Sequence, residues 1–277
     1  MTDRDQSTPL DEAALRVEVL GEPSYWRRLD VVAQTGSTNA DLLARASSGE
    51  DIDGAVLIAE HQTAGRGRHG RTWLASPGAQ LTLSVGVRVD DVPTAGWGWL
   101  SLATGLAVVD AVAGETPVEP CLKWPNDVLA GASNSMRKLA GILSEVSQPF
   151  AVVGIGLNVA EAPRDVDGPG ATSLRDEGVQ TPDRDLLVRR LLRELGERIK
   201  AWRGADDGWA ALANDYRARS LTLGSRVRAE LPGGSDVVGI ARDVDEQGRL
   251  CLETWDNDAD KSGQTVVVAA GDVVHLR

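Results

Sequence analysis

Apolar residues in the first part of the chain are grouped in short runs separated by polar and glycine-rich segments. Residues 29–32, 55–59, 139–146 and 150–157 are runs rich in Val, Ile, Leu and Ala, and residues 80–85 alternate polar with apolar side chains. Runs of this length predict β-strands, and strict alternation predicts a strand that is buried on one face.

Helical patterns lie between and after these runs. Residues 40–46 follow a Ser-Thr-Asn sequence at 37–39, whose side chains commonly cap the first turn of a helix. Residues 95–113 are apolar and rich in small side chains, which favours a helix packed on a sheet. Residues 186–202 have helical periodicity with Arg and Glu on the outer face. This order of elements predicts an α+β domain.

The pattern changes after Ser220. Short valine- and leucine-rich runs then alternate with turn-rich segments such as Pro-Gly-Gly at 232–234, which is typical of a small β-barrel. Residues 256–263 are polar, acidic and end in glycine, as in an extended hairpin loop, and we assign them no role. We expect an N-terminal arm or short helix in residues 1–24, an α+β domain in residues 25–220 and a small β-module in residues 221–277.

Composition narrows the functional classes. The chain has 277 residues, and its 41 acidic and 29 basic residues give a formal net charge of -12, the wrong sign for a protein that coats nucleic acid. Two cysteines and three histidines are too few for a disulfide framework or a four-cysteine zinc site, and they argue against a metalloenzyme. Residues 1–20 lack the apolar core of a signal peptide, and no stretch approaches the roughly 18 apolar residues of a membrane span. We therefore expect a cytoplasmic protein that binds neither DNA nor a membrane.

Residues 65–71 read Gly-Arg-Gly-Arg-His-Gly-Arg and lie between two predicted strands. Glycines allow backbone N–H groups to turn towards an anion, and arginines offer paired donors to a phosphate or carboxylate. The spacing matches neither the phosphate-binding loop of nucleotide hydrolases nor a dinucleotide fingerprint. A solvated basic turn and a nucleic-acid patch are the alternatives. We favour an anion site, because a glycine accompanies each arginine and no acid offsets their charge.

Two lysine-containing segments supply further charged groups. Residues 123–127 read Lys-Trp-Pro-Asn-Asp, so a cation, an amide and a carboxylate occupy one turn. Lys123 could bridge a carboxylate and a phosphate, and Asp127 could hold Mg²⁺ or a ribose hydroxyl. A plain turn packed on Trp124 is the alternative. Lys138 enters an apolar strand, where a strand-end lysine that reaches the surface is the ordinary explanation.

Residues 153–158 read Val-Gly-Ile-Gly-Leu-Asn. Because glycines alternate with apolar residues, one face of this strand carries no side chains, and a flat ligand or another backbone can lie against it. The Ser-Thr-Asn sequence at 37–39 is explained equally by helix capping and by hydrogen bonds to an amide or ureido group of a ligand.

In their order and spacing these segments resemble the biotin protein ligase family. The resemblance runs from about residue 31 to residue 158. It implies a catalytic domain of the class II synthetase-like type, with a mixed sheet flanked by helices, and a C-terminal SH3-like β-barrel. The motifs that carry it are Ser-Thr-Asn at 37–39, Gln62 with Gly-Arg-Gly-Arg-x-Gly-Arg at 65–71, Lys-Trp-Pro-Asn-Asp at 123–127, Lys-Leu-Ala-Gly-Ile-Leu at 138–143 and Gly-Ile-Gly-Leu-Asn at 154–158.

The resemblance also implies an activity. Members of the family use ATP and Mg²⁺ to convert biotin into biotinyl-5′-AMP and pyrophosphate. They then transfer biotin to a lysine of the biotin carboxyl-carrier domain of an acyl-CoA carboxylase. Bringing a carboxylate against a phosphate holds like charges together, so cations from a closing loop are needed. The implied catalytic residues are Lys123, Arg66 and Arg68, and whether Lys123 or Lys138 dominates stays open.

The remaining site residues follow from the same resemblance. The implied biotin contacts are Ser37, Thr38, Asn39, Gln62, Gly65, Arg66, Gly67, Arg68, Lys123, Gly141, Gly154 and Gly156. The implied ATP or adenylate contacts are Arg66, Arg68, Arg71, Trp73, Asn126, Asp127, Lys138 and Asn158, with Asp127 as the candidate Mg²⁺ ligand. For Trp73, simple packing is an equal alternative.

Partners and rival functions complete the expectations. Bifunctional members of the family carry an N-terminal helix-turn-helix domain, and only residues 1–24 precede the predicted domain here. We therefore expect a monofunctional ligase that binds no operator DNA, either a monomer or a homodimer that forms with the adenylate. The rivals are a lipoate or octanoate ligase, whose apolar pocket has no ureido group to bind, and a non-catalytic binding module.

Overall fold

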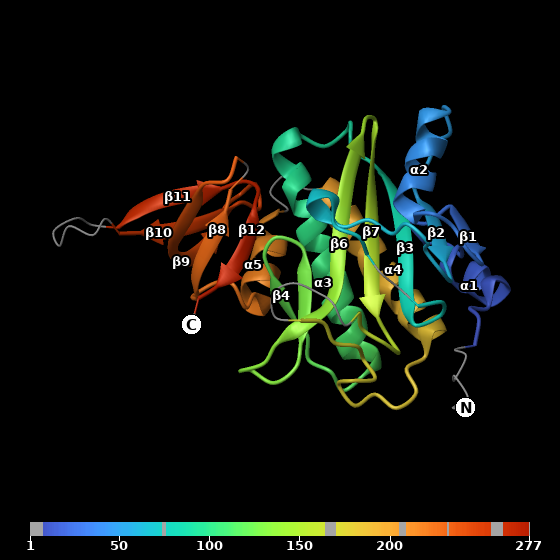
Figure 1. Ribbon diagram of the computed structural model, residues 1–277. Helices are drawn as coiled ribbons and strands as arrows, with labels where there is room; N and C mark the ends of the chain where they lie inside the picture. The colour runs from blue at the N-terminus through green and yellow to red at the C-terminus, as the bar shows by residue number, and fades with distance from the viewer. Residues whose placement is uncertain are drawn as a thin grey trace.

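A mixed seven-stranded sheet forms the centre of the larger domain (Figure 1). The computed structural model describes residues 8–73, 76–163, 170–204, 209–231, 233–255 and 263–276. The strand order is β1-β2-β3-β7-β6-β5-β4, with β1 and β2 parallel and all other neighbours antiparallel. The strands are β1 (Arg28–Val32), β2 (Ala55–Ala59), β3 (Gln80–Arg88), β4 (Cys121–Lys123), β5 (Asp127–Ala130), β6 (Arg137–Ser147) and β7 (Phe150–Asn158). The five apolar or alternating runs predicted as strands are all in this sheet.

Helices cover one face of this sheet. α3 (Trp97–Glu115) and α4 (Arg184–Arg203) pack on each other and on the sheet, and α5 (Trp209–Arg219) packs on α3 (Figure 1). Alternate residues of a strand point to opposite faces, so the buried Leu81 and Leu83 of β3 belong to the core under these helices. The main hydrophobic core lies between the helices and this face.

The opposite face of the sheet carries polar residues. α2 (Thr38–Ser47) lies there, and its Leu42 belongs to a small second core with Leu57, Phe150 and Val152. Next to this core, β3 presents three buried polar side chains, namely Gln80, Thr82 and Ser84. A face that combines burial with hydrogen-bonding groups can hold a polar ligand.

The segment Thr94–Glu115 consists of the short 3-10 turn η2 (Thr94–Gly96) followed directly by α3. Its length and its mean hydropathy of 1.3 would allow it to cross a membrane. The expectation that no stretch approaches this length was therefore wrong for this segment. Its apolar window is 72% buried inside the protein, because the sheet and α4 enclose it. A helix that is apolar all round is expected in such a core position.

Five antiparallel strands form a second, smaller sheet in the order β11-β10-β9-β8-β12 (Figure 1). They are β8 (Arg226–Glu230), β9 (Asp236–Val244), β10 (Leu250–Thr254), β11 (Gln264–Val268) and β12 (Asp272–His275). This is the all-β module predicted from the sequence. The described parts of β11 and β12 form its two edges and do not pair, so the described strands do not close into a full barrel, and the sheet is consistent with the expected SH3-like type. Residues 256–262 of the expected hairpin loop lie outside the described residues.

Two buried tryptophans tie the second sheet to the larger domain. Trp99 Nε1 donates to the carbonyl oxygen of Glu246 at 2.7 Å, and Trp124 Nε1 donates to that of Gly248 at 3.0 Å. Both carbonyls belong to the turn between β9 and β10. Trp124 is therefore a packing anchor, as one interpretation of its motif proposed, and the second sheet sits against the β4 and β5 end of the first.

The described residues before β1 contain one helix, α1 (Glu12–Val19). Glu12 accepts a hydrogen bond from the backbone N–H of Val31 at 3.2 Å, and Arg16 donates to the carbonyl of Leu29 at 2.8 Å. The helix therefore covers the outer edge of β1. These described residues do not form the three-helix unit of a helix-turn-helix DNA-binding domain.

Candidate active site

A cavity of about 660 Å³ opens on the polar face of the large sheet, a size that suits a small organic ligand. Every predicted site residue except Gly65 lines it, namely Ser37, Thr38, Asn39, Gln62, Arg66, Gly67, Arg68, Arg71, Trp73, Lys123, Asn126, Asp127, Lys138, Gly141, Gly154, Gly156 and Asn158. The C-terminal sheet also lines it, through Glu230, Asp272, Val273 and Val274, which the sequence did not indicate. The cavity thus brings together motifs that lie far apart in the sequence.

The arginine-rich loop is a tight hairpin. Its backbone is closed by a hydrogen bond from Trp73 N to Gly65 O at 2.8 Å and another from Gly67 N to Arg71 O at 2.7 Å. A Cβ atom on Gly65 would lie 2.5 Å from Trp73 O, so this position requires glycine. Gly70 has a φ of 74°, which glycine adopts without strain. The glycines therefore shape a narrow turn, and the arginines extend from it.

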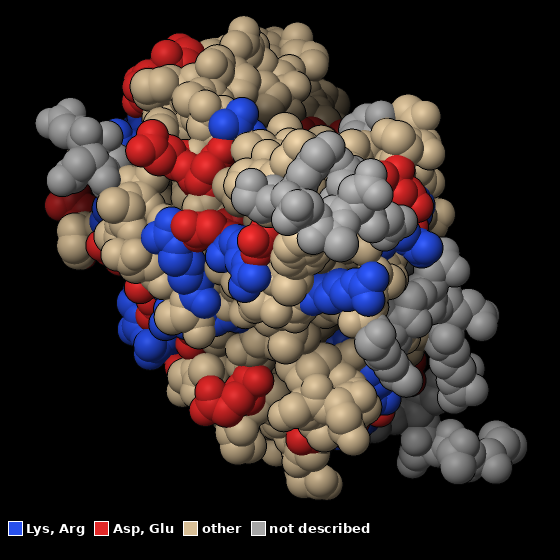
Figure 2. Space-filling view, turned by 90° about the vertical axis from the view of Figure 1, so that its left-hand side faces the viewer, with Lys and Arg blue, Asp and Glu red and all other residues tan. Residues whose placement is uncertain are grey.

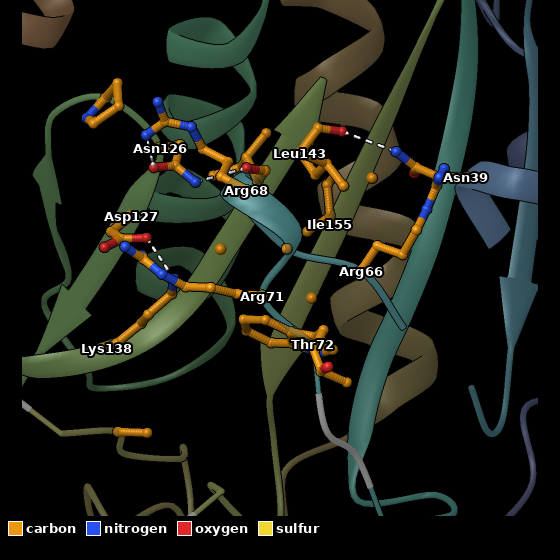
Figure 3. A pocket seen from close by; sticks show the side chains of 18 of the residues that line it. Asn39, Arg66, Arg68, Arg71, Thr72, Asn126, Asp127, Lys138, Leu143 and Ile155 are labelled. Carbon is orange, nitrogen blue, oxygen red and sulfur yellow. Dashed lines mark hydrogen bonds and ion pairs between the residues drawn. The ribbon is translucent and has the colours of Figure 1, made fainter. Parts of the chain in front are cut away.

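The arginines of the loop contact acceptors in different parts of the chain, and Figure 3 shows the contact of Arg68 with Asn126. Arg66 donates to Glu145 Oε2 at 2.8 Å, on β6. Arg68 donates to Asn126 Oδ1 at 3.2 Å and to Asp272 Oδ1 at 3.1 Å. The loop therefore lies across the cavity, from the α2 side of the sheet to the C-terminal module.

Asp272, the first residue of β12, binds two arginines of this loop and lies near its histidine. Arg68 and Arg71 both pair with its carboxylate, and His69 Nε2 lies 3.6 Å from Oδ1. Burial alone would raise the pKa of Asp272, but the hydrogen bond from Arg71 and the charges of Arg71 and Arg68 hold this pKa below its ordinary value. Burial also lowers the pKa of Arg68. Asp272 is therefore a carboxylate at neutral pH and holds the loop from the C-terminal side.

Two lysines face one carboxylate at the β4–β6 end of the sheet. Asp127 pairs with Lys123 across β4 and β5, and the Lys123 Nζ lies 3.8 Å from Asp127 Oδ2. Lys138, on β6, places its Nζ 2.6 Å from Asp127 Oδ1 (Figure 3). All three side chains are less than a quarter exposed. Lys138 therefore lies in the cavity wall, and the surface explanation for a strand-end lysine does not apply to it.

The Ser-Thr-Asn sequence caps α2 and also joins a buried polar cluster. Ser37 Oγ accepts a hydrogen bond from the N–H of Ala40 at 3.5 Å, which begins the helix. Thr38 N donates to Gln62 Oε1 at 2.8 Å, and Thr38 Oγ1 lies 2.6 Å from Ser84 Oγ. The two explanations of this sequence are therefore compatible, because different atoms serve the cap and the cavity.

Asn39 extends the cluster towards β6. Its Oδ1 accepts from Ser84 Oγ at 2.6 Å, and its Nδ2 donates to Leu143 O at 3.1 Å and Glu145 Oε2 at 2.8 Å (Figure 3). Ser84 and Glu145 were not among the predicted site residues. The sequence signal for Ser84 was its place at one of the polar positions of the alternating residues 80–85. The only sequence signal for Glu145 was its position two residues after the Lys-Leu-Ala-Gly-Ile-Leu motif.

The glycines of β6 and β7 form the flat floor that the sequence predicted. A Cβ atom on Gly156 would lie 2.3 Å from Trp73 Cε2, and one on Gly141 would lie 3.0 Å from another atom of the same indole. A Cβ atom on Gly154 would lie 2.2 Å from Asn39 Oδ1. The groups that lie against this floor are the indole of Trp73 and the side-chain amide of Asn39.

The charges around the cavity suit anionic ligands and one divalent cation that arrives with them. Within the described ranges, no group of three or more His, Cys, Asp or Glu residues could hold a metal ion. Asp127 offers a single carboxylate, which fits Mg²⁺ bound mainly by the phosphates of a nucleotide. On the face shown in Figure 2, the described basic side chains lie beside acidic ones and form no continuous basic surface.

Comparisons with known proteins agree with this geometry. The model of the biotin/lipoate A/B protein ligase family matches residues 31–159, and that of the biotin protein ligase C-terminal domain matches residues 222–276. A biotin–[acetyl-CoA-carboxylase] ligase of Mycobacterium tuberculosis is 66% identical, over all of both chains. The bifunctional ligase/repressor BirA of Escherichia coli is 34% identical over 78% of this chain and 66% of its own. Biotin protein ligase from Aquifex aeolicus, solved with biotin and ATP, has a TM-score of 0.74 at 24% identity, covering 91% of this chain and 100% of that one. The chain therefore belongs to the biotin protein ligase family.

Proposed function

We propose that this chain is a biotin protein ligase that activates biotin with ATP and transfers it to a lysine of a biotin carboxyl-carrier domain of an acyl-CoA carboxylase. The observation that carries the proposal is the cavity in which Lys123, Lys138 and Asp127 meet the arginine-rich loop and the polar cluster of α2. The relative named biotin–[acetyl-CoA-carboxylase] ligase, at 66% identity over the full length, supports the same substrates.

The first step brings two anions together. A carboxylate oxygen of biotin attacks the α-phosphorus of ATP, and the bond from this phosphorus to the oxygen of the leaving pyrophosphate breaks. Negative charge therefore accumulates on the phosphate oxygens. Lys123, Lys138 and Arg68 line the cavity and are held in place by Asp127 and Asp272 before any substrate binds. Cations fixed in advance stabilise such charge strongly, because they need not reorganise during the reaction.

The polar cluster of α2 supplies the proposed biotin contacts. Thr38 bonds both Gln62 and Ser84, and Ser84 bonds Asn39. The remaining donors and acceptors of Thr38, Asn39 and Gln62 are therefore oriented in advance. A ureido group offers two N–H donors and a carbonyl acceptor, which amide and hydroxyl side chains can match. Arg66 ends beside this cluster, where Glu145 holds it.

The opposite end of the cavity is assigned to the nucleotide. Asn126, Asp127 and Arg71 lie there, and Asp127 is the proposed ligand for the Mg²⁺ that accompanies ATP. Bound Mg²⁺ would neutralise phosphate charge at this end.

The second step needs an amine from outside the cavity. The lysine amine of the carrier domain attacks the carbonyl carbon of biotinyl-5′-AMP, an amide bond forms, and AMP leaves with the bonding electron pair while the amine loses a proton. We place this reaction in the cytoplasm, with the enzyme a monomer or a homodimer that forms with the adenylate. Sedimentation with and without biotin and ATP measures the oligomeric state.

The decisive experiment is ATP–pyrophosphate exchange by the purified protein with Mg²⁺ and biotin, beside lipoate and no-acid controls. Exchange that requires biotin supports the proposal. Exchange with lipoate alone transfers the substrate assignment to the lipoate ligase alternative. If neither biotin nor lipoate supports exchange, the assignment of an adenylating enzyme is overturned.

A further inference from the structure

Gln80, the first residue of β3, lies beneath the cavity wall and is not among the predicted site residues. Its side chain is 3% exposed and belongs to the polar face of the sheet. Neither the motifs nor the proposed mechanism gives it a role. Burying an amide lowers the stability of the protein unless its hydrogen-bonding groups find partners.

A directional chain of hydrogen bonds runs through this residue. Trp73 Nε1 donates to Gln80 Oε1 at 2.8 Å, and Gln80 Nε2 donates to Asn158 Oδ1 at 2.9 Å. Asn158, which is fully buried, donates through its Nδ2 to Thr172 O at 2.9 Å and to Lys138 O at 3.3 Å. The chain therefore connects the last residue of the arginine-rich loop with the backbone at Lys138.

The buried end of this chain fixes its direction. Both N–H groups of the Asn158 amide face backbone carbonyls, so its Oδ1 is the atom that accepts from Gln80. Gln80 must then present Nε2 to Asn158 and Oε1 to the cavity side. That oxygen is the acceptor that the indole N–H of Trp73 meets.

The position of Trp73 depends on this acceptor and on the glycine floor together. The floor of Gly141 and Gly156 permits close contact with the ring face but is flat, so it does not fix the ring within its plane. The bond to Gln80 supplies that constraint. Lys138 Nζ lies 5.5 Å from the ring centre, so the same constraint sets the distance between the loop and this lysine.

We infer that Gln80 is a positioning residue for the adenylation reaction, acting through the indole N–H of Trp73. It anchors the end of the arginine-rich loop over the glycine floor, so that the loop closes on bound biotin and adenylate in one geometry. This inference rests on the proposed function. It predicts that a change at Gln80 affects ligand retention less when Trp73 lacks its N–H group.

The test is a double-mutant cycle with Gln80→Leu and Trp73→Phe. Both single variants remove the Trp73–Gln80 hydrogen bond, and Gln80→Leu also removes the donor to Asn158 Oδ1. Each should raise the KM for biotin and ATP and the release rate of biotinyl-5′-AMP by roughly five- to thirtyfold. Because the two variants share one bond, the effect of the double variant should be clearly smaller than the product of the two single effects. Multiplicative effects in the double variant, or wild-type KM and release in Gln80→Leu, would overturn the inference.

A matched control separates positioning from general stability. Thr82 lies two residues along β3 on the same face, is 2% exposed, and donates to Ala59 O at 2.8 Å. Thr82→Val also removes a buried hydrogen bond and should leave the KM values and adenylate release unchanged. Equal changes in Thr82→Val would assign the effect of Gln80→Leu to a loosened sheet and overturn the inference.

A ligand-free measurement keeps this inference distinct from the proposed function. The indole N–H of Trp73, identified in ¹⁵N NMR spectra by its absence in Trp73→Phe, should exchange with solvent roughly five- to thirtyfold faster in Gln80→Leu than in the wild type. Unchanged exchange contradicts the anchoring bond. If wild-type protein shows no biotin-dependent exchange of pyrophosphate, the proposed function fails, whatever the NMR result.

Discussion

Arg68 and Asp272 form an ion pair, with Nη1 3.1 Å from Oδ1, although 204 positions separate them in the sequence. Arg68 also donates to Gly271 O at 3.1 Å, and Arg71 binds the same carboxylate. The C-terminal sheet thus holds the loop that covers the cavity. The C-terminal sheet is therefore part of the site, because its Asp272 holds Arg68 and Arg71 in place.

Asp272→Asn should loosen this attachment with little loss of stability. The variant keeps the size of the side chain but removes the charge that offsets Arg68 and Arg71. We expect release of biotinyl-5′-AMP to accelerate by roughly five- to thirtyfold, because loss of about 1–2 kcal/mol of loop attachment corresponds to that factor. The free energy of unfolding should fall by no more than the same amount of about 1–2 kcal/mol, since the pair is partly exposed. Filtration of the pre-formed intermediate measures the release rate.

Asp245→Asn is the control for that variant. Asp245 pairs with Arg249 in the turn between β9 and β10, so the substitution alters an ion pair of the same sheet away from the loop. Release should stay at the wild-type rate in Asp245→Asn. A wild-type rate in Asp272→Asn as well would show that the ion pair does not retain the loop.

Lys138→Ala and Lys123→Ala should each damage adenylation. Removing one preorganised cation from a developing charge costs about 10²- to 10³-fold in rate. We expect the larger loss for Lys138, which makes the closer contact with Asp127 and lies beside Trp73. Biotin-dependent pyrophosphate exchange at saturating substrate measures the effect.

Lys200→Ala provides a comparison of the same chemistry outside the cavity. Lys200 bonds Pro23 O and Glu197 at the surface of α4, so exchange should be unaffected. If one of the two cavity lysines retained the wild-type exchange rate, that lysine would have no part in adenylation, and the question of which dominates would be answered.

The strands and motifs were predictable because their signals are local. An apolar run such as 55–59 predicts a buried strand from its own residues. The glycines at 154 and 156 predict a strand face without side chains, wherever that strand lies in the fold. The arginine-rich loop could be identified as a candidate anion site from its residues alone. These signals need no knowledge of which segments meet.

Long-range partners could not be predicted in this way. Nothing near Asp272 in the sequence distinguishes it from the other acids of an acidic chain, and its role exists only because β12 lies at the cavity. Gln80 and Ser84 were visible as polar positions in an alternating strand, but the face they occupy depends on α2 lying there. The glycine floor was predicted, whereas the Trp73 that covers it comes from a loop whose path the sequence does not define.

Stability should fall in acid through Asp53, whose side chain is 5% exposed. Burial alone would raise its pKa, but hydrogen bonds from Tyr25 and the Arg88 N–H, with the charge of Arg203, hold this pKa below its ordinary value of about 3.9. The unfolded chain therefore takes up this proton first. The contribution of Asp53 is complete above about pH 5 and is lost as the pH falls through the folded pKa.

Urea unfolding at pH 7 and pH 3.5 measures this contribution. Asp53→Asn should lower the free energy of unfolding at pH 7 by about 1–3 kcal/mol and reduce the loss between the two pH values. Asp51→Asn, at a neighbouring carboxylate that is 56% exposed, should leave both values near the wild type. An unaltered pH dependence in Asp53→Asn would contradict the depressed pKa.

Gly156→Ala tests whether the indole needs the flat floor. The added Cβ atom would lie 2.3 Å from Trp73 Cε2, so the ring must leave its place or β7 must shift. We expect the KM for biotin to rise about tenfold or more and the free energy of unfolding to fall by about 1–3 kcal/mol, the usual cost of overpacking. Gly21→Ala, whose Cβ atom meets its nearest neighbour at an ordinary 3.5 Å, is the matched substitution and should leave the KM unchanged. A wild-type KM and an unshifted Trp73 indole resonance in Gly156→Ala would show that the ring does not rest on this glycine in solution.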